Sequence, residues 1–278
     1  MSGKPLLFFV LLAALYGCLA GPAIQAQAPY RILVTNDDGM RAPGILAIAQ
    51  ALRALGEVTV VAPAENQSSK SQSLSVTDPI YLDEVQIAEG VRAWSLAATP
   101  ASCVKVALHA LLPVKPDLVV SGINNGYNTG MVSYVSGTVG AAREAALEGI
   151  PAIASSLAAA GHPDYAAAAE FTERVAQIVK TRGLERGVFL NVNVPAGSRE
   201  AIKGIRLATQ SAERGTDRFQ EQQTPTGRRY FWSIHEDPRD TVEGTDVWAT
   251  AQGYVAITPL RVGEFDRKTF DAWKDALK

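Results

Sequence analysis

Two adjacent carboxylates follow the first predicted strand of the chain. Residues 31–35 form a short apolar run, and Asn36, Asp37, Asp38 and Gly39 come directly after it. Neighbouring carboxylates at a strand end repel each other unless a positive charge lies between them, and a hard divalent cation supplies that charge. The pair therefore predicts a Mg²⁺ or Mn²⁺ site. The alternative is that Asp37-Asp38-Gly39 forms an Asx turn leading into a helix.

Two later loops carry amide and hydroxyl oxygens that could complete such a site. They follow the second and third predicted strands and contain Asn66, Gln67, Ser68 and Ser69, and Ser121, Asn124, Asn125 and Asn128, respectively. Ligand sites in open α/β sheets lie beyond the carboxyl ends of the strands. We therefore expect the three loops to converge on an all-oxygen site.

A helix start is expected beside the proposed metal. Ser136-Gly137-Thr138 opens a helical pattern that runs to Glu148. The free amides and the dipole of a helix start favour a phosphate group. Alternatively, Ser136 or Thr138 is an N-cap, and this role is compatible with phosphate binding.

The elements that position these loops alternate between strand and helix. Strands are expected at residues 31–35, 58–62, 117–121, 150–155 and 188–194, and helices at residues 45–55, 100–112, 138–148 and 165–180. An edge hairpin is expected from residues 77–84 and 91–96. This alternation predicts an α/β fold with a doubly wound, mostly parallel, Rossmann-like sheet.

The pattern changes near the C-terminus. Residues 229–234 and 254–258 are strand-like, whereas residues 211–227 are polar and charged. We interpret residues of about 208–250 as a projecting β-hairpin arm of the same domain, which extends over residues 29–278.

The first 28 residues have the layout of a secretory leader. They contain one charged residue, Lys4, an apolar run over residues 5–20, and then small and polar residues. We therefore expect a signal segment at residues 1–28, an exported, periplasmic protein and no stable membrane span in the mature chain. Lipoprotein anchoring at Cys18 is the disfavoured alternative.

Composition excludes several classes of protein. The formal net charge of −2 argues against binding of duplex nucleic acid, which needs a positive field. A cysteine phosphatase would need an arginine six positions after Cys103, where His109 stands, and the three histidines form no ligand cluster. No Gly-x-Gly-x-x-Gly motif follows residues 31–35, which disfavours a dinucleotide fold.

Ordered sequence blocks over about residues 30–260 closely resemble the SurE family. The blocks are RILVTNDDG with APG at residues 31–44, VAP with NQS at residues 61–68, TP with CV at residues 99–104, SGIN at residues 121–124, SGTV at residues 136–139, NVNVP at residues 191–195, and TD, GYV and TPL at residues 245–260. The chain departs from the family pattern at Ala98, Ser102, Met131 and Val132, which are not proposed ligands.

The resemblance implies a metal-dependent phosphatase acting on nucleoside 5′- or 3′-monophosphates, a 5′-nucleotidase, with some members also trimming short polyphosphate. It implies one divalent ion per subunit, Mg²⁺ or Mn²⁺, with the ligands Asp37, Asp38, Ser68 and Asn124. It places Asn36, Gly39, Asn128, Ser136, Gly137 and Thr138 on the substrate side. It also implies a homodimer or homotetramer paired through the C-terminal arm.

Two mechanisms and a second function stay open at this point. Asp37 and Asp38 either hold the metal that activates a water, or one of them attacks phosphorus and forms an aspartyl phosphate. The second function is a non-catalytic exported protein that binds a nucleotide or another anion. Against it, Asp37, Asp38, Ser68 and Asn124 are all in place.

Overall fold

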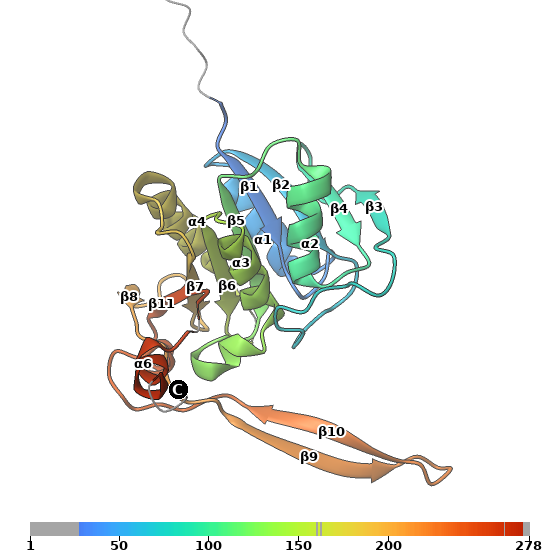
Figure 1. The fold of residues 1–278 in the computed structure, drawn as a ribbon, viewed down its shortest axis with the longest axis vertical. Helices are drawn as coiled ribbons and strands as arrows, with labels where there is room; N and C mark the ends of the chain where they lie inside the picture. The colour runs from blue at the N-terminus through green and yellow to red at the C-terminus, as the bar shows by residue number, and fades with distance from the viewer. Residues whose placement is uncertain (1–27, 160, 162, 264, 275–278) are drawn as a thin grey trace, which may run out of the picture.

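A nine-stranded sheet forms the centre of the molecule. The computed structural model describes residues 28–159, 161, 163–263 and 265–274. Within these residues the main sheet has the strand order β3-β4-β2-β1-β5-β6-β7-β11-β8 (Figure 1). The strands are β1 (Arg31–Thr35), β2 (Glu57–Pro63), β3 (Leu82–Val85), β4 (Arg92–Leu96), β5 (Leu118–Asn125), β6 (Ala152–Leu157), β7 (Val188–Val194), β8 (Ile205–Leu207) and β11 (Val255–Arg261).

The strand order grows outward in both directions from β1. Neighbouring strands are parallel except for β3 against β4 and β11 against β7. The predicted doubly wound, mostly parallel sheet is therefore confirmed. Because β1 lies between β2 and β5, the loops after these three strands leave the sheet at one edge.

Helices cover both faces of the sheet. They are α1 (Pro43–Leu52), α2 (Pro100–Val106), α3 (Gly137–Leu147), α4 (Tyr165–Arg182), α5 (Asp246–Ala251) and α6 (Arg267–Trp273), with a π turn η1 (Ala107–Leu111) and a 3-10 turn η2 (Gly130–Tyr134). Alternating residues of β1 enter different cores: Ile32 and Val34 pack with α1 and α4, whereas Leu33 packs with α2 and α3. This alternation is the period of two that a strand imposes on its side chains.

A two-stranded hairpin projects from the body (Figure 1). Its strands are β9 (Thr216–Gln223) and β10 (Arg229–Glu236), which pair antiparallel and are exposed at every residue. The predicted C-terminal β-hairpin is confirmed, while its role in oligomerisation stays a prediction.

Several predicted elements differ at their ends, including the three that follow. Strand β5 runs on to Asn125 because pairing with β6 resumes after a register shift, so the predicted loop begins later. The helix predicted to reach residue 112 ends as an α-helix at Val106 and continues as η1. The first strand of the edge hairpin begins at Leu82, after Pro79, which has no N–H group to donate to a ladder.

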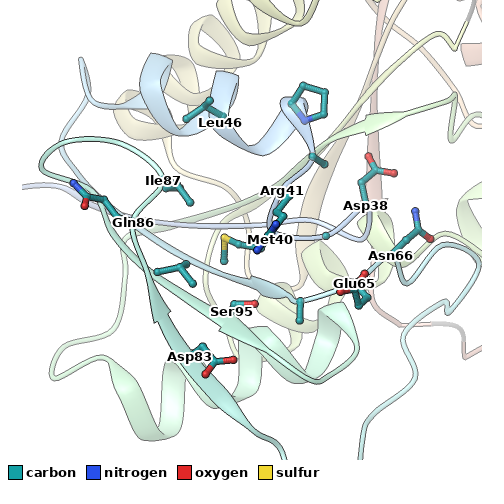
Figure 2. A pocket seen from close by; sticks show the side chains of 15 residues that line it. Asp38, Met40, Arg41, Leu46, Glu65, Asn66, Asp83, Gln86, Ile87 and Ser95 are labelled. Carbon is teal, nitrogen blue, oxygen red and sulfur yellow. The ribbon is translucent and has the colours of Figure 1, made fainter.

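A large cleft opens between the first turn of α1 and the β3–β4 edge of the sheet. Its volume is about 1290 Å³, and Figure 2 shows side chains from both walls. One end of the cleft is lined by Asp38, Gly39 and Asn66, which come from the loops after β1 and β2. The cleft therefore adjoins the predicted site.

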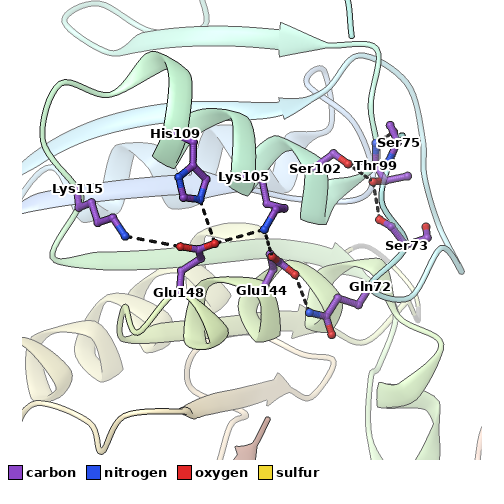
Figure 3. A network of polar contacts seen from close by, with 10 residues as sticks. All are labelled: Gln72, Ser73, Ser75, Thr99, Ser102, Lys105, His109, Lys115, Glu144 and Glu148. Carbon is purple, nitrogen blue, oxygen red and sulfur yellow. Dashed lines mark hydrogen bonds and ion pairs between the residues drawn. The ribbon is translucent and has the colours of Figure 1, made fainter. Parts of the chain in front are cut away.

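Polar contacts fix the loop after β2 to the helices α2 and α3 (Figure 3). The carboxylate of Glu144 in α3 accepts from Gln72 Nε2 at 2.7 Å and from Lys105 Nζ at 3.0 Å. At the next residue of the loop, the Ser73 carbonyl oxygen accepts from Thr99 Oγ1 at 2.6 Å. Since this loop also carries Ser68, the contacts position one of the predicted ligands.

We expect Glu144→Ala to lower the free energy of unfolding by about 2 kcal/mol, because it removes two charge-assisted hydrogen bonds from a largely buried carboxylate. Urea denaturation measures the change. The control is Glu89→Ala, which removes an exposed glutamate and should change stability by less than about 0.5 kcal/mol. Equal effects of the two substitutions would contradict a stabilising role for the Glu144 contacts.

Candidate active site

The side chain of Asn36 closes the loop that carries the two aspartates. Its amide nitrogen donates to the Gly39 carbonyl oxygen at 2.9 Å, and its Oδ1 accepts from the Gly39 amide at 3.3 Å. Gly39 has a φ of +103°, a conformation that favours glycine. These bonds come from Asn36 and span three residues, so they are not the Asx turn at Asp37-Asp38-Gly39 that was considered as the alternative. The carboxylates of Asp37 and Asp38 are left for other partners.

Asp37 is buried against the first turn of α3. Only 3% of this residue is exposed, and its Oδ2 accepts from the Thr138 amide at 3.0 Å while its Oδ1 accepts from the Thr138 hydroxyl. A Cβ on Gly137 would lie 2.8 Å from the Asp37 Cβ, so only glycine permits this approach. Burial raises the pKa of Asp37 to about 6; the hydrogen bonds from Thr138 oppose the rise and the charge of Asp38 adds to it.

Asp38 is half-buried and more accessible than Asp37. Its Oδ2 accepts from the backbone amide of Asn125 at 3.0 Å. Burial raises the pKa of Asp38, and the Asn125 amide lowers it. This hydrogen bond joins the loop after β1 to the end of β5, as predicted from the strand ends.

The loop after β2 reaches the same place through its backbone. The Gln67 amide donates to the Asp37 carbonyl oxygen at 2.7 Å. The next residue, Ser68, is exposed, and its amide donates to Asn66 Oδ1 at 2.9 Å. Ser68 is therefore held one residue away from a direct contact with the Asp37 backbone.

Asn124 supplies an amide near the end of β5, where the loop had been predicted. Its Nδ2 donates to the Gly126 carbonyl oxygen at 2.7 Å, which fixes the amide group by its nitrogen and leaves the side-chain oxygen to act as an acceptor or ligand. The structure thus brings together the loops that carry Asp37, Asp38, Ser68 and Asn124. Their service as ligands stays a prediction.

Hydrogen-bonding groups at the start of α3 have partners within the protein. Ser136 is its N-cap, with Oγ accepting from the Val139 amide at 3.1 Å. The Thr138 amide binds Asp37. The capping alternative is confirmed for Ser136, and contact of Ser136, Gly137 or Thr138 with the substrate stays a prediction.

Asn128 faces the interior of the molecule. It is 5% exposed, its Nδ2 donates to Ser156 Oγ at 2.8 Å, and its own backbone binds the side chains of Asn191 and Asn193 at 2.8 Å each. These contacts shape the loop after β5. Contact between Asn128 and the substrate stays a prediction.

Sequence reasoning missed several polar residues beneath the site. Asn191 and Asn193 alternate with apolar residues in strand β7. This pattern could have identified them as buried residues that hold a neighbouring loop. The hydroxyls of Thr35 and Ser121 lie side by side in β1 and β5, are 0% exposed, and have no hydrogen-bond partner within the described residues. Ser121 was among the residues predicted to complete the site, whereas Thr35 was missed although it directly follows the buried apolar run of β1.

The residues present fit a hard divalent cation. Two carboxylates, an amide oxygen and a hydroxyl form an all-oxygen donor set, which is the preference of Mg²⁺ and Mn²⁺. Burial raises the pKa values of Asp37 and Asp38, and a bound cation would favour the ionised form of both carboxylates. At paired positions of β1 and β5, the buried hydroxyls of Thr35 and Ser121 have no hydrogen-bond partner within the described residues.

The remaining nucleophilic and imidazole groups lie elsewhere. Cys103 is buried in α2, and burial raises the pKa of its thiol, so the thiolate is disfavoured. His109 pairs with Glu148, and His235 pairs with Asp217 on the hairpin, while His162 lies outside the described residues. Within the described residues no cluster of three or more His, Cys, Asp or Glu side chains could hold a metal ion.

Comparisons with known proteins agree on one family. The model of the family described as "Survival protein SurE" matches residues 32–217. The protein named "5'-nucleotidase SurE" from Cytophaga hutchinsonii is 42% identical over 82% of this chain and 89% of its own length. The protein of the same name from Variovorax paradoxus is 42% identical over 89% of this chain and 98% of its own.

A solved structure gives the same result. The SurE protein from Aquifex aeolicus aligns with a TM-score of 0.78 and 35% sequence identity, covering 89% of this chain and 100% of its own. This likeness supports the observed mostly parallel sheet.

The prediction of an exported, periplasmic protein is wrong. Curated SurE relatives are cytoplasmic enzymes, and no finding supports export. The proposed signal segment, with Cys18, lies outside the described residues except for Ala28. An apolar run has the hydrophobicity of a leader whether or not an export system recognises it, so composition alone was insufficient. Among the described residues, no helix has the length and apolar character to cross a membrane.

The family model matches more than half of the chain, and relatives over 40% identical align with most of it, so this chain belongs to the SurE family.

Proposed function

We propose that this protein is a metal-dependent 5′-nucleotidase that releases phosphate from nucleoside monophosphates. The observation that carries the proposal is the paired carboxylates of Asp37 and Asp38, held between the start of α3 and the end of β5. Membership of the SurE family, with relatives named 5'-nucleotidase SurE, supports the same activity. No finding supports the non-catalytic binding alternative.

Asp37, Asp38, Ser68 and Asn124 would hold one divalent ion, Mg²⁺ or Mn²⁺. When bound, such an ion polarises a phosphoryl group and makes water more acidic. The hydroxyl and amide of Thr138 keep the Asp37 carboxylate in place. Ser136 caps α3, and the Gly137 amide with the helix dipole would stabilise negative charge on the phosphoryl oxygens.

The two aspartates differ in their fitness as nucleophiles. Both oxygens of Asp37 accept hydrogen bonds from Thr138 in a buried setting, which lowers their reactivity. Asp38 is more exposed and one of its oxygens binds Asn125. The geometry therefore favours attack by water, with Asp38 as the rival covalent nucleophile.

Metal removal and Asp38→Asn should both abolish turnover. We expect chelator-treated protein to regain phosphate release from a nucleoside monophosphate when Mg²⁺ or Mn²⁺ is restored, and Asp38→Asn to lower kcat/KM by at least about 100-fold, because a carboxylate ligand is lost. Mn²⁺ should also raise the Tm of the wild type more than that of the variant. Asp78→Asn, an exposed aspartate, is the control. Full activity of Asp38→Asn would contradict the proposed role of Asp38 in the active site.

Rapid quenching should recover no phosphorylated protein. If water attacks phosphorus directly, neither the wild type nor Thr138→Val accumulates an acid-stable, hydroxylamine-sensitive phosphoenzyme with ³²P-labelled substrate. Trapped label on Asp38 would overturn the water route. A known aspartyl-phosphate enzyme processed in parallel shows that the quench preserves such a species.

Thr138→Val should lower kcat/KM by about tenfold, because Asp37 loses its hydroxyl donor while the shape of the side chain is kept. Thr138→Ser, which restores the hydroxyl, should recover most of the loss. Equal activities of the Val and Ser variants would show that the hydroxyl does not position Asp37.

A further inference from the structure

The 3-10 turn η2 lies between the projecting hairpin and the proposed metal site. Only Val135 separates its last residue from Ser136, the N-cap of α3, and the first turn of α3 holds Asp37. One end of η2 contacts residues 210–214 and 237–240, which flank the hairpin and are called the arm base below (Figure 1). The other end contacts the loop after β2. Through η2, the arm base and the site can therefore affect each other.

A buried carboxylate fixes the first residue of η2 to the arm base. Asp246 is 0% exposed, its Oδ2 accepts from the Gly130 amide at 2.9 Å, and its Oδ1 accepts from the Ser211 amide at 3.0 Å. Ser211 Oγ in turn donates to Asp240 Oδ2 at 2.6 Å, which joins the two chain segments that flank the hairpin. Asp246 has no role in the mechanism proposed above.

Three more hydrogen bonds hold η2 against the arm base. Gln210 Nε2 donates to the Gly130 carbonyl oxygen at 3.0 Å and to Ser133 Oγ at 2.8 Å. The Met131 amide donates to the Glu213 carbonyl oxygen at 2.9 Å. A Cβ on Gly130 would lie 2.5 Å from that carbonyl oxygen, so the two backbones are in close contact. A shift of the arm base would therefore move η2 as well.

The other end of η2 is hydrogen-bonded to the loop that carries Ser68. Ser71 Oγ donates to the Tyr134 carbonyl oxygen at 2.7 Å, and the Ser71 amide donates to the Val135 carbonyl oxygen at 3.0 Å. Ser69 and Ser71 have φ angles of +60° and +53°, which serine adopts only with support from its surroundings. The contacts with η2 supply part of that support, close to Ser68 in the chain.

We propose that η2 couples the arm base to the divalent-ion site, with Asp246 and Gln210 as positioning residues at one end and Ser71 at the other. The proposal rests on the metal ligands proposed above, because Ser68 is the ligand whose loop η2 holds. The three residues act through the backbone of η2 and not as ligands. Since coupling between two sites is reciprocal, a bound ion must also stabilise the arm base.

Gln210→Ala tests the end of η2 at the arm base. We expect Mn²⁺ binding to chelator-treated protein, measured by calorimetry, to weaken at least about threefold, because η2 loses two hydrogen bonds. Asp246→Asn should have a larger effect, and Gln210→Ala keeps the test valid if that variant does not fold. The matched control is Gln220→Ala on the exposed strand β9, which should bind Mn²⁺ as the wild type does. Equal Mn²⁺ affinities of Gln210→Ala and the wild type would overturn the proposal.

A double variant tests whether the two ends act through one segment. Ser71→Ala should also weaken Mn²⁺ binding about threefold, because the loop loses its hydroxyl bond to η2. In the protein with both Gln210→Ala and Ser71→Ala, the loss should be clearly smaller than the product of the single losses, since either substitution interrupts the same connection. Losses that multiply would show two independent effects and contradict coupling through η2.

Hydrogen exchange tests the reciprocal effect. Saturating Mn²⁺ should slow amide exchange of residues 210–214 in the wild type at least about threefold, and Ser71→Ala should abolish most of this protection. If Ser71 only stabilised the fold, its replacement would lower the Tm and leave the protection by Mn²⁺ intact. Mn²⁺ binding without protection of the arm base would overturn the coupling.

Exchange in metal-free protein separates this proposal from the proposed function. Gln210→Ala should exchange faster than Gln220→Ala over residues 67–73, because the loop after β2 is held less firmly even without an ion. If the wild type binds no Mn²⁺ but this difference occurs, the metal site is wrong and the coupling of the arm base to the loop stands. If Mn²⁺ binds and the two variants exchange alike, the coupling is wrong and the metal site stands.

Discussion

The burial of one carboxylate, that of Asp37, governs the architecture around the site. An ionised carboxylate that is 3% exposed is costly unless it is hydrogen-bonded, and the Thr138 amide and hydroxyl provide those bonds. To deliver them, α3 must start against the end of β1, and Gly137 permits the approach. The first turn of α3, the loop after β1 and the central strands are thereby locked into one arrangement.

The other loops are secured to this arrangement from outside. Gln67 binds the Asp37 backbone, and Glu144 holds Gln72, so the loop after β2 is attached at the site and again along α3. On the third side, Asn191 and Asn193 hold the backbone of Asn128. Each loop is hydrogen-bonded to a strand, a helix or another loop. Catalytic side chains need such support to keep their relative positions.

The chemistry divides between two regions that share Asp38. Oxygen donors and a helix start lie on one side, where a cation and a phosphate are favoured. The cleft, with acidic and apolar side chains in its lining, lies on the other side. Because Asp38 lines the cleft and also contacts the end of β5, the two regions meet at the proposed reaction centre.

The sequence by itself determined the alternation of strands and helices, the strand end that carries Asp37 and Asp38, and the presence of a C-terminal hairpin. These features follow from local periodicity and from residue preferences at element ends, which neighbouring residues largely decide. The N-terminal apolar run shows the limit of such patterns, because hydrophobicity did not establish export. Only the tertiary structure decided that Thr138 binds Asp37 from 101 positions away, that Asn128 turns inward to Ser156, and that α1 and β3 enclose a cleft. Such contacts join segments distant in the chain, so they depend on how the packed layers meet and leave no periodic trace in the sequence.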